Sequence, residues 1–411
     1  MSAELDLTRY LRPGDTIVWG QSHAEPTSLV VRLIEQRHAL ARLRLFLGIG
    51  LDDNLKPEHS DAFDFISYCG SGSNRALANA GVLDILPVHY SRLPDLMTSG
   101  QLRIDAVFLQ VSPPDEKGRH SLSMAREYLL PAIKHARVVI GEIQPDAPWT
   151  FGGPYMTERD FTALVSSDAK MPESRLRSIG PVEDAIGRNI ASLIEDGATL
   201  QVGIGNVPDA ALMALSDRRD LGIHSGAIGE GVAMLSRAGV ITNSRKAIDT
   251  GVSIGGVLMG GSVLRSFAHR NPAIKLRGSD YTHDPMVLGR IERLIAMNSA
   301  IEVDLTGQIN SETANGRYLG AVGGILDFTR AAGASKGGVP IIALPSTGSG
   351  TSRIVPALSG PVTVPRSESC VIVTEHGIAD LRGLSLSGRI SRMIAVAHPD
   401  HREELERKSR G

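Results

Sequence analysis

Short, almost wholly apolar runs recur along the chain, separated by stretches whose apolar residues recur at helical spacing. Four clear runs are RIDAVFLQVS, ARVVIGEI, GVPIIALPS and SCVIVTEHGIADL. Strands buried on both faces give continuous apolar runs, and amphipathic helices connect such strands in parallel sheets. The pattern therefore predicts an α/β protein whose sheets are mostly parallel and flanked by helices.

A turn, a strand and a helix start follow one another twice along the chain. In the first copy they fall at 14–15, 16–19 and 26–27, and in the second at 196–197, 199–202 and 208–209. Proline opens both helices, where its missing N–H loses no hydrogen bond. We therefore expect two similar open α/β domains, residues 1–180 and 181–411, joined within the polar segment 166–181.

Size and charge narrow the class of protein. A chain of 411 residues is too long for one ordinary hydrophobic core. The 43 Lys and Arg nearly balance the 45 Asp and Glu, and this argues against a nucleic-acid binder. No apolar run reaches the roughly 18 residues of a membrane span, and the first residues lack a signal-peptide pattern. Two isolated cysteines, Cys69 and Cys370, predict free buried thiols in a cytoplasmic protein.

A glycine loop in VGIGNVPDA lies between an expected strand and an expected helix. Backbone N–H groups in such a loop, together with the helix N-terminus, suit a phosphate group. The loop lacks the G-x-G-x-x-G spacing of a dinucleotide site, and an ordinary tight turn is an equally good interpretation. The candidate ligand-binding residues are Gly203, Ile204, Gly205, Asn206 and Val207.

Two stretches offer groups for acyl chemistry. The paired glycines of YLGAVGGILDF, Gly323 and Gly324, could direct backbone N–H groups at an oxyanion. A bend or a strand bulge is the commoner reason for such a pair of glycines. On one expected strand, Asn298, Glu302 and Asp304 would face the same side. These polar side chains would serve either a site or structural hydrogen bonds, because burying them alone is costly.

Other stretches carry weaker signals. Arg353 ends a Ser/Thr/Gly loop before an expected helix, and its guanidinium would suit a phosphate. The turn in VSPPDEKGRH is interpreted as scaffold, whereas QSHAEP (21–26) and YTHDPMV (281–287) are candidate borders of a pocket. We expect no metal, because neither H-E-x-x-H nor a paired C-x-x-C occurs.

Ten stretches, in order along the chain, resemble the acetyl-CoA hydrolase/transferase family and within it the 4-hydroxybutyrate CoA-transferases. They are VSPPDEKG, ASLIEDGATLQVGIGNVPDA, LGIHSG, AGVITNSRKAID, NSAIEVDLTGQIN, GAVGGILDF, IIALPST, SRIVP, VTEHGIADLRG and AHPDHREEL. The resemblance implies two domains of the CoA-transferase type, with coenzyme A as substrate or ligand. It also implies that the protein acts on an acyl-CoA and a small carboxylate, as a homodimer or larger homo-oligomer.

The same resemblance implies roles for particular residues. In relatives, the loop that corresponds to Gly203–Val207 contacts CoA. The turn that corresponds to Gly323 and Gly324 supports an oxyanion, with Asn298 nearby as a possible helper.

The chain departs from the family at the residue that carries the chemistry. Family transferases read H-S-E, and that glutamate forms a mixed anhydride and then a glutamyl-CoA thioester. This chain reads His224-Ser225-Gly226, and glycine can form neither intermediate. On a helix, Glu230 would lie one turn beyond Gly226, about 6 Å along the axis, but relatives have an acid there in addition to their glutamate.

Two functions stay open at this point. An acyl-CoA enzyme that transfers CoA or hydrolyses the thioester would use Glu230, or a water activated by an acid, with Gly323 and Gly324 at the oxyanion. A CoA-binding or acyl-CoA-binding protein would keep the glycine loop and lack transfer activity. We expect the enzyme, since the family membership favours it.

Overall fold

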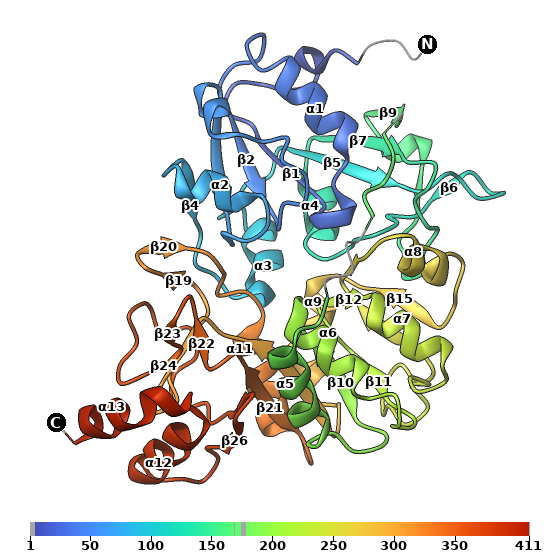
Figure 1. The fold of residues 1–411 in the computed structure, drawn as a ribbon. Helices are drawn as coiled ribbons and strands as arrows, with labels where there is room; N and C mark the ends of the chain where they lie inside the picture. The colour runs from blue at the N-terminus through green and yellow to red at the C-terminus, as the bar shows by residue number, and fades with distance from the viewer. Residues whose placement is uncertain (1–4, 168, 174–177, 411) are drawn as a thin grey trace. The chain divides into compact units, whose positions relative to one another are not determined.

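The computed structural model describes residues 5–167, 169–173 and 178–410 (Figure 1). By its internal contacts the chain forms two compact units. Unit 1 comprises Met1–Arg175, Ile254–Thr282 and Arg317–Gly323, and unit 2 comprises Leu176–Ser253, His283–Gly316 and Gly324–Gly411. The division at residue 180 stays a prediction, and the two units differ from it because two later segments belong with unit 1. Of the expected linker 166–181, residues 168 and 174–177 lie outside the described part.

Unit 1 is built on a seven-stranded parallel sheet with the strand order β4-β3-β2-β1-β5-β7-β9. Its strands are β1 (Thr16–Trp19), β2 (Leu43–Leu47), β3 (Phe63–Ser67), β4 (Leu83–Ile85), β5 (Ala106–Val111), β7 (Val138–Ile143) and β9 (Ala163–Ser166). Every residue of β1 and β5 is buried. Such strands need apolar side chains on both faces, and this confirms the interpretation of the apolar runs.

The helices of unit 1 are α1 (Thr27–Glu35), α2 (Asn74–Asn79), α3 (Leu93–Thr98), α4 (Leu129–His135), α8 (Ser262–Ala268) and α9 (Ser279–Thr282). Helix α4 packs on β1 and β5 of the sheet, and α2 packs on β4. Helix α1 buries Leu29, Val30 and Leu33 in one apolar cluster with residues of the central strands. Short strands lie outside the main sheet at β6 (Arg119–His120), β8 (Met156–Thr157), β14 (Val257–Met259), β15 (Ile274–Leu276) and β20 (Arg317–Tyr318).

Unit 2 has a six-stranded sheet with the order β11-β10-β16-β21-β25-β26. Its strands are β10 (Thr199–Val202), β11 (Gly222–Ile223), β16 (Leu294–Ser299), β21 (Val339–Ala343), β25 (Val371–Thr374) and β26 (Gly377–Asp380). All neighbours pair in parallel except β25 and β26. The run SCVIVTEHGIADL is therefore a hairpin and not the single strand that was expected, because the chain reverses at Glu375 and His376.

The helices of unit 2 are α5 (Pro181–Ala191), α6 (Asn206–Met213), α7 (Glu230–Arg237), α10 (Pro285–Leu288), α11 (Ile325–Ala334), α12 (Leu386–Val396) and α13 (Pro399–Ser409). Helix α11 packs on β16 and β21, and α5 packs against α6 and β25. Short strands lie at β12 (Ala227–Gly229), β17 (Glu302–Asp304), β18 (Ile309–Asn310), β19 (Thr313–Ala314), β22 (Thr347–Gly348), β23 (Thr351–Ser352) and β24 (Ile354–Val355); β13 (Ser253–Gly255) begins in unit 2 and ends in unit 1.

The expected internal repeat is confirmed at β1 and β10, whose bounds match the sequence pattern. The helix after β10 begins two residues earlier than expected, at Asn206. Gly205 makes the earlier start possible, since its φ of +123° turns the chain sharply at the N-cap. Pro208 then falls in the first turn, where it costs no hydrogen bond.

Three further features bear on the class of protein. Both cysteines are free and buried, as expected. Within residues 5–167, 169–173 and 178–410, no helix combines the length and apolarity that a membrane crossing requires. Across the same described ranges, no three His, Cys, Asp or Glu side chains are arranged to hold a metal ion.

Candidate active site

Three groups of predicted site residues in unit 2, the loop 203–207, Asn298 and the segment 224–226, lie at the carboxyl ends of neighbouring parallel strands. The strand order reverses between β10 and β16, and loops that follow two such strands border a crevice where α/β proteins bind ligands. Asn298, near the end of β16, exchanges two side-chain hydrogen bonds with Gln201 of β10, at 3.0 and 3.3 Å. The amide of Asn298 is thereby held at the reversal point.

The glycine loop follows β10 at the same point. The N–H of Gly203 donates to the carbonyl of Met297 on β16 at 2.9 Å, and a Cβ at Gly203 would lie 3.1 Å from that oxygen. The loop therefore needs a small residue where it passes β16. Ile204 is half exposed, and Gly205 leads into α6. This arrangement places the loop amides and the first turn of α6 together, as an anion site would require.

His224, Ser225 and Gly226 follow β11, the strand beside β10. The hydroxyl of Ser225 donates to the carbonyl of Val202 at 3.1 Å, and the N–H of Val202 lies 3.2 Å from the same hydroxyl. His224 and Ser225 are fully buried. The serine therefore links this segment to the end of β10 by hydrogen bonds. The next residue, Gly226, is half-buried.

One histidine ring lies against both Gly226 and Gly324. A Cβ at Gly226 would lie 3.0 Å from Cε1 and 3.1 Å from Nε2 of His283, and a Cβ at Gly324 would lie 2.7 Å from the same Nε2. Gly324 is the N-cap of α11, and the ring of Phe328 in that helix meets the His283 ring at 4.7 Å. The two glycines thus provide the space that the imidazole occupies.

The expected position of Glu230 is wrong. Residues Ala227–Gly229 are extended in β12, and α7 begins at Glu230 itself. An extended chain advances about 3.3 Å per residue, so Glu230 lies roughly 13 Å along the chain from Gly226 and not one helical turn. The two glycines at 226 and 229 weaken the helix that the sequence suggested, because glycine loses most entropy there.

The glycine turn before α11 includes one residue with a left-handed φ. Gly323 has a φ of +54° and Gly324 a φ of −94°. Consecutive residues with φ of opposite sign point neighbouring N–H groups in similar directions and form an anion-binding concavity. The oxyanion role of both glycines stays a prediction, and α11 packs on β16 directly after them.

Arg353 does not precede a helix. It lies directly after the β22–β23 hairpin and before β24, and its guanidinium packs against Gly348 of that hairpin. Its backbone N–H donates to Ser346 O at 2.9 Å, and Val303 donates to its carbonyl at 2.9 Å. The phosphate role of Arg353 stays a prediction, at a residue whose backbone is hydrogen-bonded on both sides.

The two acids expected on the strand of Asn298 belong to another sheet. Glu302 and Asp304 lie in β17, which pairs with β18 and β24. Glu302 accepts from Asn310 at 2.9 Å, and Asp304 accepts the N–H of Thr306 at 2.8 Å. Strand β16 ends at Ser299 and β17 begins at Glu302 in another sheet. The expectation that these polar side chains face the same side of one strand is therefore wrong. The open alternative, structural hydrogen bonding, fits both side chains.

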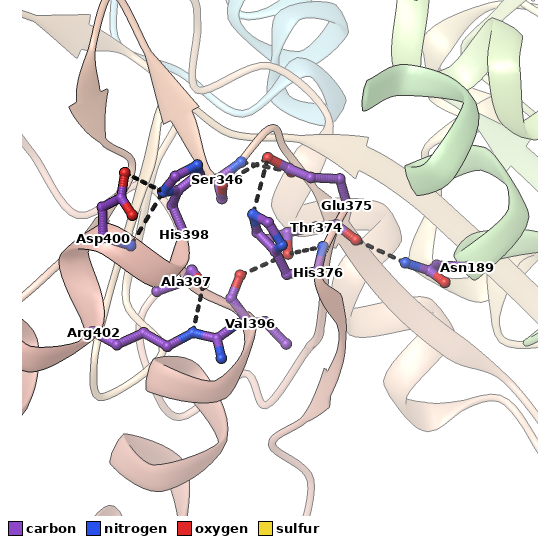
Figure 2. A network of polar contacts seen from close by, with 10 residues as sticks. All are labelled: Asn189, Ser346, Thr374, Glu375, His376, Val396, Ala397, His398, Asp400 and Arg402. Atoms are coloured by element: carbon purple, nitrogen blue, oxygen red, sulfur yellow. Dashed lines mark hydrogen bonds and ion pairs between the residues drawn. The ribbon is translucent and has the colours of Figure 1, made fainter. Parts of the chain in front are cut away.

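A polar network that the sequence did not indicate joins the ends of β21 and β25 (Figure 2). Ser346 donates to the carboxylate of Glu375 through its hydroxyl at 2.6 Å and through its N–H at 2.9 Å. His376 Nε2 lies 3.6 Å from Glu375, and its ring meets that of His398 edge to face at 5.3 Å. Because the carboxylate lies between serine and histidine, the histidine is not placed to take the hydroxyl proton. The network therefore fastens the β25–β26 turn.

Unit 1 holds its own polar cluster at the carboxyl ends of β1 and β3. The amide nitrogen of Gln21 donates to Glu127 at 2.6 Å and to Tyr90 at 3.0 Å, and its Oε1 accepts from Tyr68 at 2.6 Å. Tyr90 also donates to Glu127 at 2.8 Å. Gln21 belongs to the stretch 21–26 that the sequence marked as a pocket border, whereas nothing in the pattern around Glu127 indicated its partner.

Burial raises the pKa of Glu127 to about 7, although the hydrogen bonds from Tyr90 and Gln21 act in the opposite direction. Its Oε2 has no hydrogen-bond partner among the described residues, and its φ of +32° is unusual for a residue with a side chain. Burial, with Asp52 nearby, also raises the pKa of Glu25 to about 8. Buried acids with shifted pKa values and strained backbone are typical of functional sites.

Comparison with known proteins relates the chain to one family. The sequence profile of the acetyl-CoA hydrolase/transferase N-terminal domain matches residues 2–158, and that of the C-terminal domain matches residues 260–409. The chain is 37% identical over 395 residues to the 4-hydroxybutyrate coenzyme A transferase of Clostridium kluyveri, covering 95% of this chain and 92% of the relative.

Two solved structures have the same fold. RipA from Yersinia pestis superposes with a TM-score of 0.93 at 33% identity, over 97% of this chain and 94% of that one. The 4-hydroxybutyrate CoA-transferase from Porphyromonas gingivalis gives a TM-score of 0.82 at 32% identity, over 98% and 95%. These likenesses confirm the α/β fold that the apolar runs predicted.

Proposed function

The chain belongs to the acetyl-CoA hydrolase/transferase family, and from that premise we propose that it opens acyl-CoA thioesters, passing CoA to a carboxylate or releasing it to water. One observation carries the proposal. The glycine loop, Asn298 and the segment 224–226 come from three neighbouring strands and meet at the edge where the strand order of unit 2 reverses. Ligands of open α/β sheets bind at such an edge.

In this proposal the residues of the loop, Gly203 to Val207, hold the pyrophosphate of CoA. The N–H groups at the start of α6 supply hydrogen bonds and the positive end of a helix dipole. Gly323 and Gly324 direct their N–H groups at the thioester oxygen as it gains charge, and Asn298 offers an amide donor. Arg353 would pair with a phosphate through its guanidinium.

The route after binding depends on Gly226. A CoA transfer through an enzyme-bound anhydride needs a side-chain carboxylate, and glycine has none. Glu230 starts a helix after three extended residues, so it is a poor substitute for a carboxylate at position 226. We therefore expect thioester hydrolysis, or direct attack by the acceptor carboxylate, to exceed transfer through a covalent adduct.

The test is an assay of the purified protein with a panel of acyl-CoA esters, with and without acetate. A thiol reagent reports free CoA, mass spectrometry reports acetyl-CoA, and intact-protein mass reports any adduct. The proposal expects free CoA or acetyl-CoA above the uncatalysed rate, with no glutamyl-CoA adduct at steady state. CoA binding with no thioester opening on any ester would instead indicate a binding protein, and an adduct on Glu230 would establish a relocated nucleophile.

Assembly and compartment are part of the same proposal. The family resemblance supports a homodimer or larger homo-oligomer, and the two free cysteines suit the cytoplasm. Light scattering during size-exclusion chromatography measures the assembly state. A monomer at micromolar concentration would contradict the proposed homo-oligomer.

A further inference from the structure

Two side chains bond the outer backbone groups at the end of β11, the edge strand of the unit 2 sheet. Strand β11 begins the order β11-β10-β16-β21-β25-β26 and pairs with β10. Gly222 donates its N–H to Ala198 at 2.9 Å, and His224 donates its N–H to Leu200 at 3.0 Å. Neighbouring residues of a strand direct their N–H and C=O groups to opposite sides, so Ile223 directs both of its groups away from β10.

Both outward groups of Ile223 are bonded by side chains from the loop that follows α7. Asn243 Oδ1 accepts the N–H of Ile223 at 2.8 Å, and Lys246 Nζ donates to the carbonyl of Ile223 at 2.8 Å. Lys246 also donates to the carbonyl of Val252 at 2.6 Å, and Asn243 donates to Ser253 Oγ at 3.0 Å. The two side chains therefore connect the end of β11 with the far end of that loop.

Lys246 is held in place by its surroundings. The residue is only 5% exposed, and a Cβ at Gly222 would lie 2.7 Å from its Cγ. The stem of the lysine thus lies directly against β11, where glycine leaves room for it. Burial lowers the pKa of Lys246 to about 8, although Asp249 acts in the opposite direction. The amine is therefore mainly protonated at pH 7, and a charged donor forms stronger hydrogen bonds than a neutral one.

The residue that these side chains hold comes immediately before the segment 224–226 of the candidate site. That segment is bonded to the end of β10 through the Ser225 hydroxyl. The glycine loop has a separate attachment, because Gly203 donates to Met297 of β16 at 2.9 Å. A displacement of Ile223 would therefore move the segment 224–226 more than the glycine loop.

We propose that Lys246 and Asn243 are positioning residues, which set the place of the segment 224–226 against the bound acyl-CoA thioester. This inference rests on the proposed function. Both side chains act through the backbone of Ile223 and take no part in bond making or breaking. Because a displacement of about 1 Å can lower the rate of a reaction a hundred-fold, loss of either side chain should slow thioester opening without weakening CoA binding.

The first test compares Lys246→Met with Arg218→Met in the full chain. Methionine keeps a long apolar side chain and removes the donor. Arg218 matches the number of bonds lost, because it also donates to two backbone carbonyls of unit 2, those of Ile194 and Ala191, at 2.8 and 3.0 Å.

The rate of CoA release is measured per CoA-binding site, counted by titration with CoA, so that unfolded molecules do not enter the comparison. We expect Lys246→Met to lower this kcat by about ten- to a hundred-fold, with a Kd for CoA within about three-fold of the wild-type value. Arg218→Met should keep the wild-type kcat per site.

Asn243→Gly provides a test that does not depend on whether Lys246→Met folds. Asn243 has a left-handed φ of +56°, which glycine adopts without strain, so the change removes only the side-chain bonds. Asn315→Gly is the control, because Asn315 has a φ of +52° and is exposed. We expect kcat per site to fall about three- to ten-fold in Asn243→Gly and to stay at the wild-type value in Asn315→Gly.

The outcomes separate the inference from the proposed function. Wild-type kcat per site in Lys246→Met, or in Asn243→Gly should the first variant not fold, would overturn the inference alone. Equal losses in a variant and its control would do the same, as would a weaker Kd for CoA in place of a lower kcat. A wild-type protein that opens no thioester would overturn the proposed function, and the inference with it.

Discussion

The ring of His283 occupies part of the space that a side chain at position 226 would need. The sequence showed that the family nucleophile is replaced by glycine, and this required only the H-S-G pattern. It marked the stretch 281–287 as a pocket border but gave no reason to connect its histidine with Gly226, because the two residues come together only through the fold of unit 2. Tertiary packing adds the proximity itself, since a Cβ placed on Gly226 would lie 3.0 Å from the His283 ring.

Measurements of stability can test whether the His283 ring excludes a side chain at position 226. Gly226→Glu should lower the free energy of unfolding by about 1–3 kcal/mol, the usual cost of overpacking, because the new Cβ presses on the His283 ring. In the His283→Ala background the same substitution should cost less than about 1 kcal/mol. Urea unfolding of the four proteins measures the coupling, and strictly additive losses would show that the ring does not occupy the space.

A second residue-scale prediction concerns Glu127. Its folded pKa of about 7 is above the ordinary 4.5, so its contribution to stability is complete below about pH 4.5 and is lost as the pH rises through 7. A glutamine at position 127 (Glu127→Gln) has nearly the same shape and an oxygen that can accept from Gln21 and Tyr90. Because it does not ionise, its contribution to stability does not fall as the pH rises. The stability of the variant relative to wild type should therefore rise between pH 5 and 8, by on the order of 3 kcal/mol.

Urea unfolding at the two pH values measures this difference. Glu116→Gln, an exposed side chain, controls for the loss of one carboxylate. A relative stability of Glu127→Gln that falls with pH would mean that the carboxylate form is the one that the native protein favours.

At the scale of elements, local pattern predicted the strands well and the segments between them less well. The bounds of β1 and β10 follow from apolar runs after a turn, because a buried parallel strand constrains every residue. The helix expected through Gly226 and Glu230 was wrong, and so was the single strand through Asn298 and Asp304. In these places the pattern is short, and tertiary pairing decides between strand, turn and helix.

The start of α6 depends on one glycine. Gly205 has a φ of +123° with a ψ of −179°, a region that essentially only glycine adopts, and a Cβ there would meet nothing within 4 Å. Gly205→Ala should therefore cost about 1–3 kcal/mol through backbone strain alone and weaken CoA binding.

Gly333→Ala provides the matched control. Gly333 lies inside α11 with open space around it, and alanine should stabilise the helix by about 0.5–1 kcal/mol. Thermal unfolding and CoA titration of both variants check the pair. Unchanged stability and CoA affinity in Gly205→Ala would remove the glycine loop from the proposed site.

At the scale of the molecule, unit 1 is discontinuous in sequence. Within it, Leu258 donates to Met124 at 2.7 Å, Arg126 to Gly256 at 2.9 Å, and Leu276 to the carbonyl of Phe151 at 2.9 Å. A division read along the chain cannot find such a unit, because segments of ordinary composition return to it after the 78 residues of 176–253 and again after the 34 residues of 283–316.

A fragment of residues 1–180 should therefore not fold by itself. It lacks 254–282 and leaves the backbone groups of residues such as Met124 and Phe151 without their partners. We expect no cooperative urea transition for this fragment, and recovery of one when the fragment 181–411 is produced with it. A cooperative transition of 1–180 alone would show that the linear division describes an autonomous domain.

The discontinuity also has a consequence during synthesis. The first 175 residues of unit 1 leave the ribosome about 150 residues before the last segment, 317–323, that completes it. At about 5–20 residues per second, this nascent chain waits roughly 7–30 seconds for the last partners of its backbone groups, such as the carbonyl of Gly320 that accepts the N–H of Gly70. Translation speed and chaperone supply, more than the thermodynamic stability of the finished protein, should then determine how much of it reaches the native state in the cell.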